Sequence, residues 1–421
     1  MKRYSESMEY LSNLENSGII FGLDNIESIL QSIENPHKKL KFIHVAGTNG
    51  KGSVSTMLSF ILKKAGYRVG KYTSPHLIRF NERIALDEKD INDVELSYII
   101  DYIRKNIEDR GIKRQFSYFD FTTAVAFEFF YRKKVDIAII EVGLGGRLDS
   151  TNVIFPILSI ITNVAFDHQQ YLGYNLEAIA KEKSGIIKER IPVVTGAEGG
   201  ALSVIHDIAE KNSSPLYVLG RDFFYEKNKD QNMTYKGKGN PLKDIYINLL
   251  GDHQLKNAAL ALCATELLID YGYKITNRAI YDAFLNINWQ GRLEILQKNP
   301  LIILDGAHNP NAVEAISYFI KTHYNSKRKI LIFGVMADKD YKGMLRELVP
   351  EMDVIIFTRP DTDRALSPYQ IAHISEDCII TEDVKTALLK AKAVAGEDDL
   401  ILITGSFYTV GEAKKLFHEV F

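Results

Sequence analysis

The sequence predicts an α/β protein with two domains, each built on a doubly wound, mostly parallel β-sheet. Short apolar segments alternate along the chain with segments whose apolar residues recur at helical spacing. This alternation is typical of parallel sheets that carry helices on both faces. The chain has 421 residues, of which 46% are hydrophobic, so it is too long for one compact core and long enough for two.

The first series of alternations starts after two helical patterns, at residues 4–16 and 22–33. A strand is expected at residues 41–47, followed by a glycine-rich loop and by a helix whose apolar face starts at Val54. A helix is also expected from Asn175 to Lys188. Further strands are expected in the segments YRVGKYTS, VDIAIIEVG, ILSIITNVAFDH and IPVVTG.

The second series of alternations follows a polar, glycine-spotted segment at residues 219–242, which we expect to form surface hairpins, and a helix at 253–272. We place the domain boundary at residue 294, giving domains of 1–294 and 295–421. The second domain is expected to be smaller and Rossmann-like, with strands in the segments LIILD, KILIFGVM, DVIIFT, CIIT and DLILITG.

Charge and composition exclude several classes of partner. The formal net charge is −2, so no basic field exists to attract nucleic acid or an anionic membrane. No segment is apolar and long enough to cross a bilayer, and the N-terminus turns polar where a signal peptide needs an apolar run. Cys263 and Cys378 form no CxxC motif, which fits a reducing compartment. We expect a monomer in the cytoplasm.

The stretch GTNGKGS (residues 47–53) lies between a predicted strand and a predicted helix. Backbone N–H groups and the helix dipole make such a loop an anion site, and Lys51 adds a positive charge. The loop is a variant, since Val45 replaces the first glycine of the strict P-loop pattern and Gly52 separates Lys51 from Ser53. A plain tight turn and a dinucleotide fingerprint are the alternatives. Nucleotide phosphate is the favoured ligand, and the first domain is therefore expected to be of the P-loop type.

Three polar residues, Ser74, Glu141 and His168, are expected at the carboxyl ends of strands, where ligands bind in doubly wound sheets. Beside a triphosphate, these side chains are suited to holding Mg²⁺. Each has an alternative role, because serine caps helices, a carboxylate pairs with surface cations and single histidines are often structural. In the loop that follows Glu141, Arg147 and Asp149 either serve a ligand or simply pair with each other.

Nine motifs in this order resemble the successive signatures of the folylpolyglutamate synthases, within the muramyl-ligase superfamily. The resemblance runs from about residue 40 to the C-terminus. The motifs are GTNGKGS, TSPHL, EVGLGGRLDSTN, NVAFDH, EKSGIIK, GDHQLKNAALAL, GRLE, DGAHNP and TGSFY.

The resemblance implies that the glycine loop holds the phosphates of ATP and that two Mg²⁺ ions are bound by Ser74, Glu141 and His168. Lys183 matches the family's carbamylated lysine, which would be a further metal ligand. Because a free lysine has a pKa of about 10.4, burial or nearby cations must favour its neutral form; a solvated helix lysine is the alternative. Contacts to the nucleotide are expected at Gly47, Thr48, Asn49, Gly50, Lys51, Gly52, Ser53, Asn257, Arg292 and Asp305.

The resemblance also implies which residues meet the substrates. Asp305 and His308 would be presented across a cleft by the second domain, with a helix cap as the alternative role of Asp305. In SYFDF (residues 117–121), which resembles part of the pterin pocket, Asp120 stands where relatives commonly carry glutamate, so folate is better supported than dihydropteroate as the acceptor. Catalytic roles are expected for Lys51, His168, Lys183, Arg292 and His308. Substrate contacts are expected for Phe119, Asp149, Ser150, Asp305, His308 and Ser406.

The implied reaction is the ATP-dependent joining of L-glutamate to the γ-carboxylate of a folate, or to dihydropteroate, through an acyl phosphate. A different amino-acid ligase of the same superfamily is one alternative. Those ligases carry a separate UDP-sugar domain, for which the 46 residues before Gly47 leave no room. The other alternative is a P-loop ATPase or binding module that couples ATP to conformation without ligation.

Overall fold

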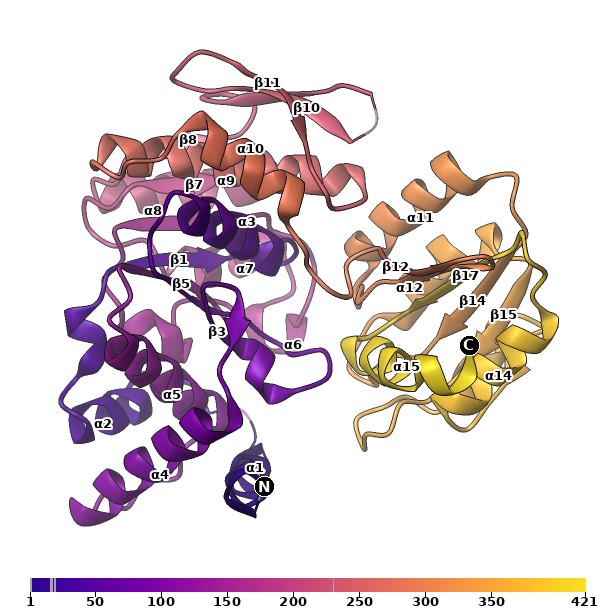
Figure 1. Cartoon of the computed structure of the whole chain (residues 1–421), viewed down its shortest axis with the longest axis horizontal. Helices are drawn as coiled ribbons and strands as arrows, with labels where there is room; N and C mark the ends of the chain where they lie inside the picture. The colour runs from indigo at the N-terminus through magenta and orange to yellow at the C-terminus, as the bar shows by residue number, and fades with distance from the viewer. Residues whose placement is uncertain (1, 16–17, 19, 230) are drawn as a thin grey trace.

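The computed structural model describes residues 2–15, 18, 20–229 and 231–421, so the end of the helical pattern predicted at 4–16 lies outside the described residues. Two α/β units stand side by side, joined by the segment between α10 and β12 (Figure 1). The predicted fold class is confirmed. Among the described residues, no helix has both the length and the apolar character that a bilayer crossing requires.

The first unit is built on an eight-stranded sheet in the order β4-β3-β2-β5-β1-β6-β7-β8. The strands from β2 to β8 in this order are parallel, and β3 and β4 extend one edge in antiparallel fashion. The strands are β1 (Phe42–Ala46), β2 (Val69–Tyr72), β3 (Ile84–Leu86), β4 (Lys89–Asp90), β5 (Ile137–Glu141), β6 (Leu158–Ile161), β7 (Val193–Thr195) and β8 (Leu216–Val218).

Helices cover both faces of this sheet, so its central strands β1, β5 and β6 are buried at every position. In β1, Phe42 packs into the core beneath α2, α4 and α5, whereas Ile43 and Val45 pack into the opposite core beneath α3, α9 and α10. The α-helices are α1 (Lys2–Glu15), α2 (Asp24–Ser32), α3 (Lys51–Lys64), α4 (Asp93–Asp109), α5 (Tyr118–Lys133), α6 (Gln169–Leu172), α7 (Leu176–Ser184), α8 (Gly199–Lys211), α9 (Asp252–Asp270) and α10 (Asn277–Asn286). Short 3₁₀ helices are η1 (Pro36–Lys39), η2 (Phe80–Arg83) and η3 (Ser150–Val153).

The polar segment predicted as surface hairpins forms a separate three-stranded antiparallel sheet, which extends past residue 242. Met233, Tyr235 and Ile245 join its inner face to the core under α9. The Tyr235 hydroxyl also donates a hydrogen bond to Glu266 Oε2 at 2.7 Å. The strands are β9 (Phe224–Lys227), β10 (Asn232–Lys236) and β11 (Leu242–Tyr246).

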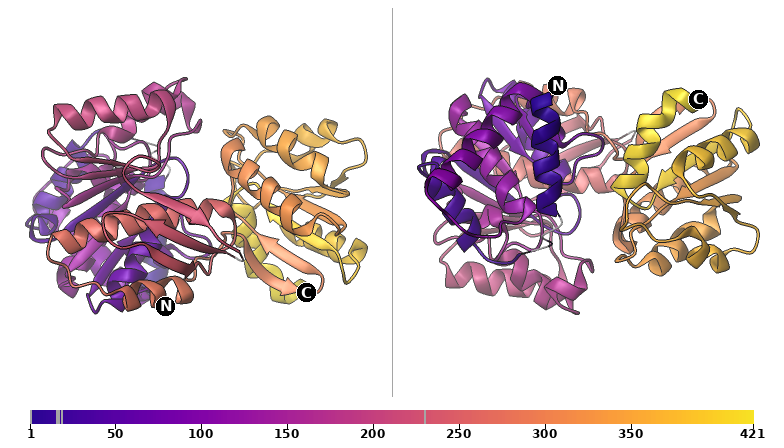
Figure 2. Two further views of the ribbon diagram at one scale, coloured as in Figure 1. Left: turned by 90° about the horizontal axis from the view of Figure 1, so that it is seen from above. Right: turned by 90° about the horizontal axis from the view of Figure 1, so that it is seen from below.

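The second unit is built on a six-stranded sheet in the order β12-β13-β17-β14-β15-β16, in which only β12 is antiparallel to its neighbour. Helices α11 and α12 cover one face, and α14 and α15 cover the other (Figure 2). The strands are β12 (Glu294–Lys298), β13 (Leu301–Leu304), β14 (Lys329–Phe333), β15 (Val354–Phe357), β16 (Ile379–Ile380) and β17 (Leu400–Thr404). The helices are α11 (Pro310–Tyr324), α12 (Tyr341–Leu348), η4 (Val349–Glu351), α13 (Pro368–Ile371), η5 (Ala372–Ile374), α14 (Val384–Val394) and α15 (Phe407–Val420).

The segment that joins the two units is anchored on the helix of the glycine loop. A Cβ atom on Gly52 would lie 2.9 Å from Cζ2 of Trp289, so the indole packs directly on this glycine. The ammonium of Lys71 lies 4.8 Å from the Trp289 ring centre. Gly291 follows with a φ of 67°, a conformation that favours glycine. The connection is therefore fixed to the first unit up to Trp289.

Burial of α3 holds the glycine loop in place, and this gives a test of the fold. Leu58 is fully buried on α3, whereas Lys64 is exposed at the end of the same helix. We expect Leu58→Ala to lower the free energy of unfolding of this domain by about 2–5 kcal/mol, because it leaves a cavity. Lys64→Ala should change it by less than about 0.5 kcal/mol. Urea titration followed by Trp289 fluorescence measures both, and equal effects would contradict the packing described.

Candidate functional site

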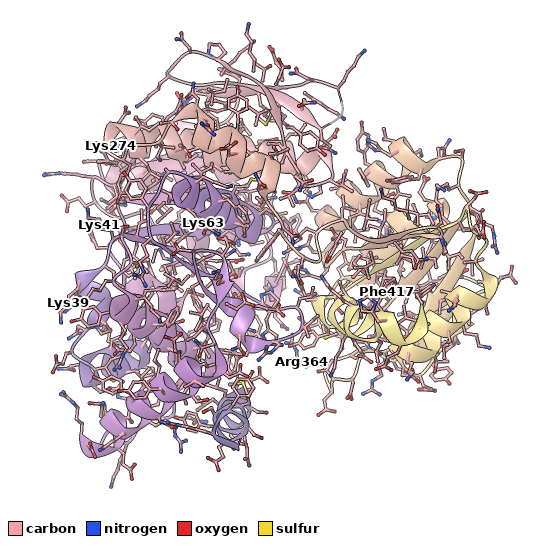
Figure 3. All side chains as sticks on the ribbon, in the orientation of Figure 1. Lys39, Lys41, Lys63, Lys274, Arg364 and Phe417 are labelled. Atoms are coloured by element: carbon pink, nitrogen blue, oxygen red, sulfur yellow. The ribbon has the colours of Figure 1, made fainter. Side chains whose placement is uncertain are left out.

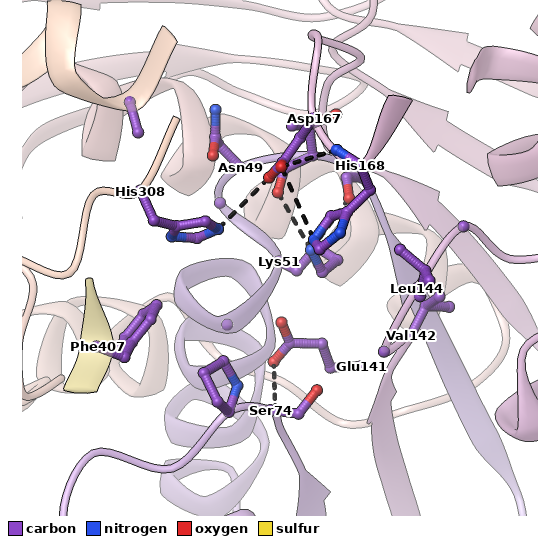
Figure 4. A pocket seen from close by; sticks show the side chains of 18 of the residues that line it. Asn49, Lys51, Ser74, Glu141, Val142, Leu144, Asp167, His168, His308 and Phe407 are labelled. Carbon is purple, nitrogen blue, oxygen red and sulfur yellow. Dashed lines mark hydrogen bonds and ion pairs between the residues drawn. The ribbon is translucent and has the colours of Figure 1, made fainter. Parts of the chain in front are cut away.

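A cleft of about 1010 Å³ lies between the two units and is lined by residues of both. Its walls come from the carboxyl ends of β1, β2, β5 and β6 in the first sheet and of β13, β14 and β17 in the second. In the first sheet β5 and β6 flank β1, so the point where the strand order reverses opens into the cleft. Figure 4 shows His308 and Phe407 of the second unit facing Lys51, Asp167 and His168 of the first.

The glycine loop, residues 47–53, connects β1 to the start of α3 and forms the floor of the cleft. Gly47 and Gly50 have φ angles of 148° and 83°. A Cβ atom on Gly47 would lie 1.8 Å from Thr162 Oγ1, and one on Gly50 would lie 2.4 Å from Asn257 Oδ1. These positions therefore accept only glycine. The N–H groups of the first helical turn have no intrahelical partners and face an anion site.

Two ammonium groups, of the half-buried Lys51 and the buried Lys183, converge on the carbonyl oxygen of Gly47. Lys51 Nζ lies 3.1 Å from this oxygen and 3.1 Å from Thr48 O, and Lys183 Nζ lies 2.9 Å from Gly47 O. Burial lowers the pKa of Lys51. Burial, and then the charge of Lys51, lower the pKa of Lys183 to about 7. Lys183 is 4% exposed, so the alternative of a solvated helix lysine is wrong.

Glu141 ends β5 as a buried carboxylate that forms no ion pair with any described residue. Its Oε2 accepts a hydrogen bond from the backbone N–H of Ser74 at 3.3 Å. No ion pair to Glu141 exists within the described part of the chain. Burial raises its pKa, and the charge of Lys51 opposes this shift. A buried carboxylate of this kind is costly unless a cation binds beside it.

His168 differs in position from Ser74 and Glu141. It lies well beyond the end of β6, at the N-cap of α6, with a φ of 50°. Its Nε2 lies 3.2 Å from Lys339 Nζ. Burial lowers the pKa of His168 to about 4, Asp167 opposes the shift, and Lys339 adds to it. The expectation of a strand-end position therefore holds for two of the three residues, whereas a loop brings His168 to the same cleft.

The loop after Glu141 is held by Asp149. Its carboxylate accepts hydrogen bonds from the backbone N–H groups of Leu144 at 2.8 Å and Thr151 at 3.0 Å. Burial raises the pKa of Asp149 to about 6, and these hydrogen bonds oppose the shift. Arg147 instead forms an ion pair with Glu182 at 3.0 Å, so the alternative in which Arg147 pairs with Asp149 is wrong.

Only part of the segment 117–121 lines the cleft. Phe119 lines it, with its ring packed so closely on Gly143 that a Cβ atom there would lie 2.5 Å away. Asp120 does not line the cleft. Its carboxylate accepts hydrogen bonds from the Ser117 N–H at 3.0 Å and the Ser150 hydroxyl at 2.7 Å. Asp120 therefore caps α5 and holds Ser150, which does line the cleft.

The opposite wall is formed by Arg292, from the segment that joins the units, and by Asp305, His308 and Ser406 of the second unit. The Arg292 guanidinium lies 4.4 Å from the ring centre of Phe407. Asp305 accepts hydrogen bonds from the N–H groups of residues 293 and 307, both at 2.8 Å. Asn309, and not Asp305, caps α11, so the alternative role of Asp305 as a helix cap is wrong. Ser406 caps α15, and its Oγ lies 3.1 Å from the Thr409 N–H.

Asp167 was not singled out from the sequence, although it stands beside His168 in the motif NVAFDH. Its Oδ1 accepts from Lys339 Nζ at 2.7 Å, and its Oδ2 from Asn309 Nδ2 at 3.1 Å. His308 Nε2 lies 3.5 Å from Oδ2. Burial acts to raise the pKa of Asp167, but the hydrogen bond from His308 and the charge of Lys339 hold it well below its ordinary range. Lys339 lies in a loop well beyond the end of β14, as His168 does beyond the end of β6, so the strand-end criterion identifies neither position.

Asparagine side chains form a second contact between the two units. Asn49, in the glycine loop, donates to Asn309 Oδ1 at 3.2 Å and to Asn311 Oδ1 at 2.9 Å. Asn309 Nδ2 donates back to Asn49 Oδ1 at 3.0 Å. The start of α11 is therefore hydrogen-bonded to the loop that we expect to hold phosphates.

Arg83 is a second residue that the sequence analysis missed. This arginine lines the cleft, is 9% exposed, and donates to His76 Nδ1 at 2.8 Å. Burial, with the charge of Arg83, lowers the pKa of His76 to about 3, so the imidazole is neutral and leaves the guanidinium charge uncompensated. Arg364, labelled in Figure 3, also lines the cleft but pairs with Asp338 at 3.2 Å.

Comparison with known proteins matches both units to the same enzyme family. Residues 45–265 match the Mur ligase middle domain, and residues 291–407 match the Mur ligase glutamate ligase domain. The dihydrofolate synthase/folylpolyglutamate synthase of Bacillus subtilis (strain 168) is 35% identical over 424 residues, covering 98% of each chain.

Solved structures agree with this assignment. The folylpolyglutamate synthase of Thermotoga maritima has a TM-score of 0.85 and 37% identity, covering 99% of this chain and 96% of that one. E. coli FolC in complex with DHPP and ADP has a TM-score of 0.91 and 30% identity, covering 98% of both chains. The resemblance drawn from the motifs is confirmed: this chain belongs to the folylpolyglutamate synthase family of Mur ligases.

Proposed function

We propose that this protein is an ATP-dependent ligase that joins L-glutamate to the γ-carboxylate of folates, and also to dihydropteroate. One observation carries the proposal: the glycine loop, the unpaired carboxylate of Glu141 and the polar groups of the second unit line one cleft. The names of the relatives support both activities, and the ADP complex of a relative supports the nucleotide. We further propose that it acts as a monomer in the cytoplasm.

The cleft supplies what carboxylate activation requires. The substrate carboxylate attacks the γ-phosphorus of ATP, ADP leaves, and an acyl phosphate forms. Lys51 and Arg292 offset charge on the transferring phosphoryl group, which is the main contribution that a protein makes to this chemistry. Residues 47–53 and Asn257 would hold the nucleotide, with Asp305 facing it from the second unit. Closure of the cleft excludes the water that would hydrolyse the acyl phosphate.

The amino group of glutamate then attacks the acyl carbon, phosphate leaves, and a base accepts the proton of the amine. His168 is a weak base because its pKa is lowered to about 4. His308 is better suited to orienting groups than to accepting this proton, since both of its ring nitrogens face acceptors: Nδ1 lies 3.0 Å from Gly306 O, and Nε2 lies 3.5 Å from Asp167 Oδ2. Ser406 stands beside it on the same wall as a contact for glutamate.

The donor set fits Mg²⁺ as a cofactor. Glu141 supplies a buried carboxylate that forms no ion pair with a described residue, and Ser74 is its neighbour, with its backbone N–H 3.3 Å from Glu141 Oε2. His168 and Lys183 complete the proposed ligands, with Lys183 as a carbamate. Its pKa of about 7 leaves much of the amine neutral near pH 7 and therefore able to react with carbon dioxide. Two bound ions would neutralise negative charge on the phosphate oxygens.

The folate site is proposed at the part of the cleft lined by Phe119, Asp149 and Ser150. Phe119 offers an aromatic face, and it lies 5.9 Å from Tyr72, ring centre to ring centre. Asp149 and Ser150 offer polar groups held by their own hydrogen bonds. Arg83 offers a positive charge to a substrate carboxylate, since no carboxylate pairs with it in the part of the chain that the structure describes.

Phosphate release tests the function directly. The enzyme is supplied with ATP, Mg²⁺ and glutamate, with tetrahydrofolate, dihydropteroate or no pterin, and products are weighed by mass spectrometry. We expect products one glutamyl unit heavier from both pterins. Conjugation of tetrahydrofolate alone would limit the protein to polyglutamate synthesis. ATP hydrolysis that ignores glutamate and pterin, without any conjugate, would instead identify an ATPase or binding module.

Replacement of Glu141 separates a metal ligand from a structural carboxylate. We expect Glu141→Gln to lower kcat/KM by at least about 100-fold and to abolish the thermal stabilisation given by Mg²⁺ and an ATP analogue. The unfolding midpoint without ligands should stay the same or rise, because an uncompensated buried charge is removed. Glu189→Gln, at an exposed side chain, is the control. A lower midpoint with normal Mg²⁺ dependence would assign Glu141 a structural role.

Replacement of Arg83 tests its proposed contact to a carboxylate. We expect Arg83→Met to raise the KM for folate or glutamate by about 10- to 150-fold, because the variant loses a hydrogen bond to a charged group and such bonds contribute this much to binding. The KM for ATP should change little. Arg278→Met, which alters a 90% exposed side chain, is the matched control in steady-state assays. An increase in the KM for ATP alone would argue against this assignment.

A further inference from the structure

The ion pairs that join the two units converge on one carboxylate, that of Asp167. Within the described residues, its partners across the interface are Lys339 at 2.7 Å and His308 at 3.5 Å. The side chains of Asp167 and Lys339 are each 8% exposed. Most other ion pairs are solvent-exposed, and the comparably buried pair, Lys71 with Glu88, lies inside the first unit. Removal of one partner from a largely buried charge pair at a domain interface leaves the other charge uncompensated, which is strongly destabilising.

Lys339 lies on a loop that is fixed to the second unit by hydrogen bonds. The Lys339 N–H donates to Met336 O at 3.2 Å, and the Ala337 N–H donates to Arg364 O at 2.9 Å. The next residue, Asp340, caps α12 through the Gly343 N–H at 3.0 Å. The position of the ammonium group therefore follows the position of the second unit as a body.

Asp167 of the first unit and Lys339 of the second both contact His168. The Asp167 carboxylate accepts from the backbone N–H of His168 at 2.9 Å, and Lys339 Nζ lies 3.2 Å from His168 Nε2. His168 has a φ of 50°, a left-handed conformation that is uncommon for non-glycine residues. Loss of Lys339 removes both its contact with the His168 imidazole and the cation that pairs with Asp167.

We propose that Lys339 is a positioning residue that acts through Asp167, so that closure of the two units and placement of His168 are one event. This inference deepens the proposed function and rests on it. Lys339 itself needs no contact with substrate. A second small pocket, of about 240 Å³, lies at the same junction and is lined by residues of both units, including Asp167 and Lys339 themselves.

The direct alternative is that Lys339 binds the transferring phosphoryl group as a catalytic cation. The two roles differ in how the effects of mutations combine. If Lys339 acts through Asp167, removal of either residue breaks the same link, and the double variant loses no more than a single one. If the residues act separately, the losses multiply.

The experiment is a double-mutant cycle of Lys339→Met and Asp167→Asn, with the full chain and both substrates. We expect each single variant to lower kcat by about 10- to 100-fold, as loss of a residue that orients a metal ligand does, and the double variant to be no worse. The KM for ATP should change less than kcat. Losses that multiply would overturn the proposal in favour of direct phosphate contact.

Small-angle scattering with a non-hydrolysable ATP analogue and Mg²⁺ supplies a readout independent of turnover. The variants should have a larger radius of gyration than the wild type, and Lys339→Arg, which keeps the charge, should restore compactness and most of the activity. Unchanged dimensions in Lys339→Met would overturn the proposal. Lys385→Met, which breaks the exposed pair with Glu419, is the control and should match the wild type in both assays.

The two proposals fail in distinguishable ways. If the wild type forms no glutamyl conjugate, the proposed function fails, whereas scattering still reports whether Lys339 holds the units together. Should Asp167→Asn fail to fold, as judged by its thermal unfolding, the comparison of Lys339→Met with Lys339→Arg decides alone. Compactness restored by arginine supports the proposal, and its absence contradicts it.

Discussion

The rest of the site depends on how closely the glycine loop packs against its neighbours. Gly47 approaches Thr162, and Gly50 approaches Asn257, so closely that a side chain at either glycine would collide. Gly52, the residue that departs from the strict P-loop pattern, packs under Trp289 at the start of the connection to the second unit. One tight loop thus sets the anion site, the position of the α9 asparagine and the anchor of the interdomain segment.

Around this loop, the protein holds charges that it does not fully neutralise. Two ammonium groups share the carbonyl of Gly47, while the Glu141 carboxylate receives only a backbone N–H among the described residues. Charges buried in this way reduce stability and are retained where a ligand offsets them. The arrangement suits a polyanionic nucleotide bound together with a divalent cation, which would balance both signs at once.

Polar groups stand on both walls of the cleft because the two sheets present the carboxyl ends of their strands to each other. Asp305, Ser406 and Lys339 follow strands of the second sheet, and they face Glu141 and the glycine loop of the first. Asn49 and Asp167 hydrogen-bond across the gap. The groups that we propose to position phosphate and the groups that join the two units are therefore immediate neighbours.

The sequence by itself determined the fold class, the alternation of strands and helices and the glycine loop, because periodicity is a local property. The site residues that it predicted all line the cleft, but they are a minority of the residues there. It also identified the family through the order of its motifs. Tertiary structure alone decided three roles. Asp120 completes the N-terminal cap of α5, and Arg147 pairs with Glu182 and not with Asp149. A loop carries His168 into the cleft. Tertiary structure alone revealed Arg83 and the pair of Asp167 with Lys339, 172 positions apart. The physical reason is that hydrogen-bond partners and burial arise from contacts between distant segments, which local spacing does not encode.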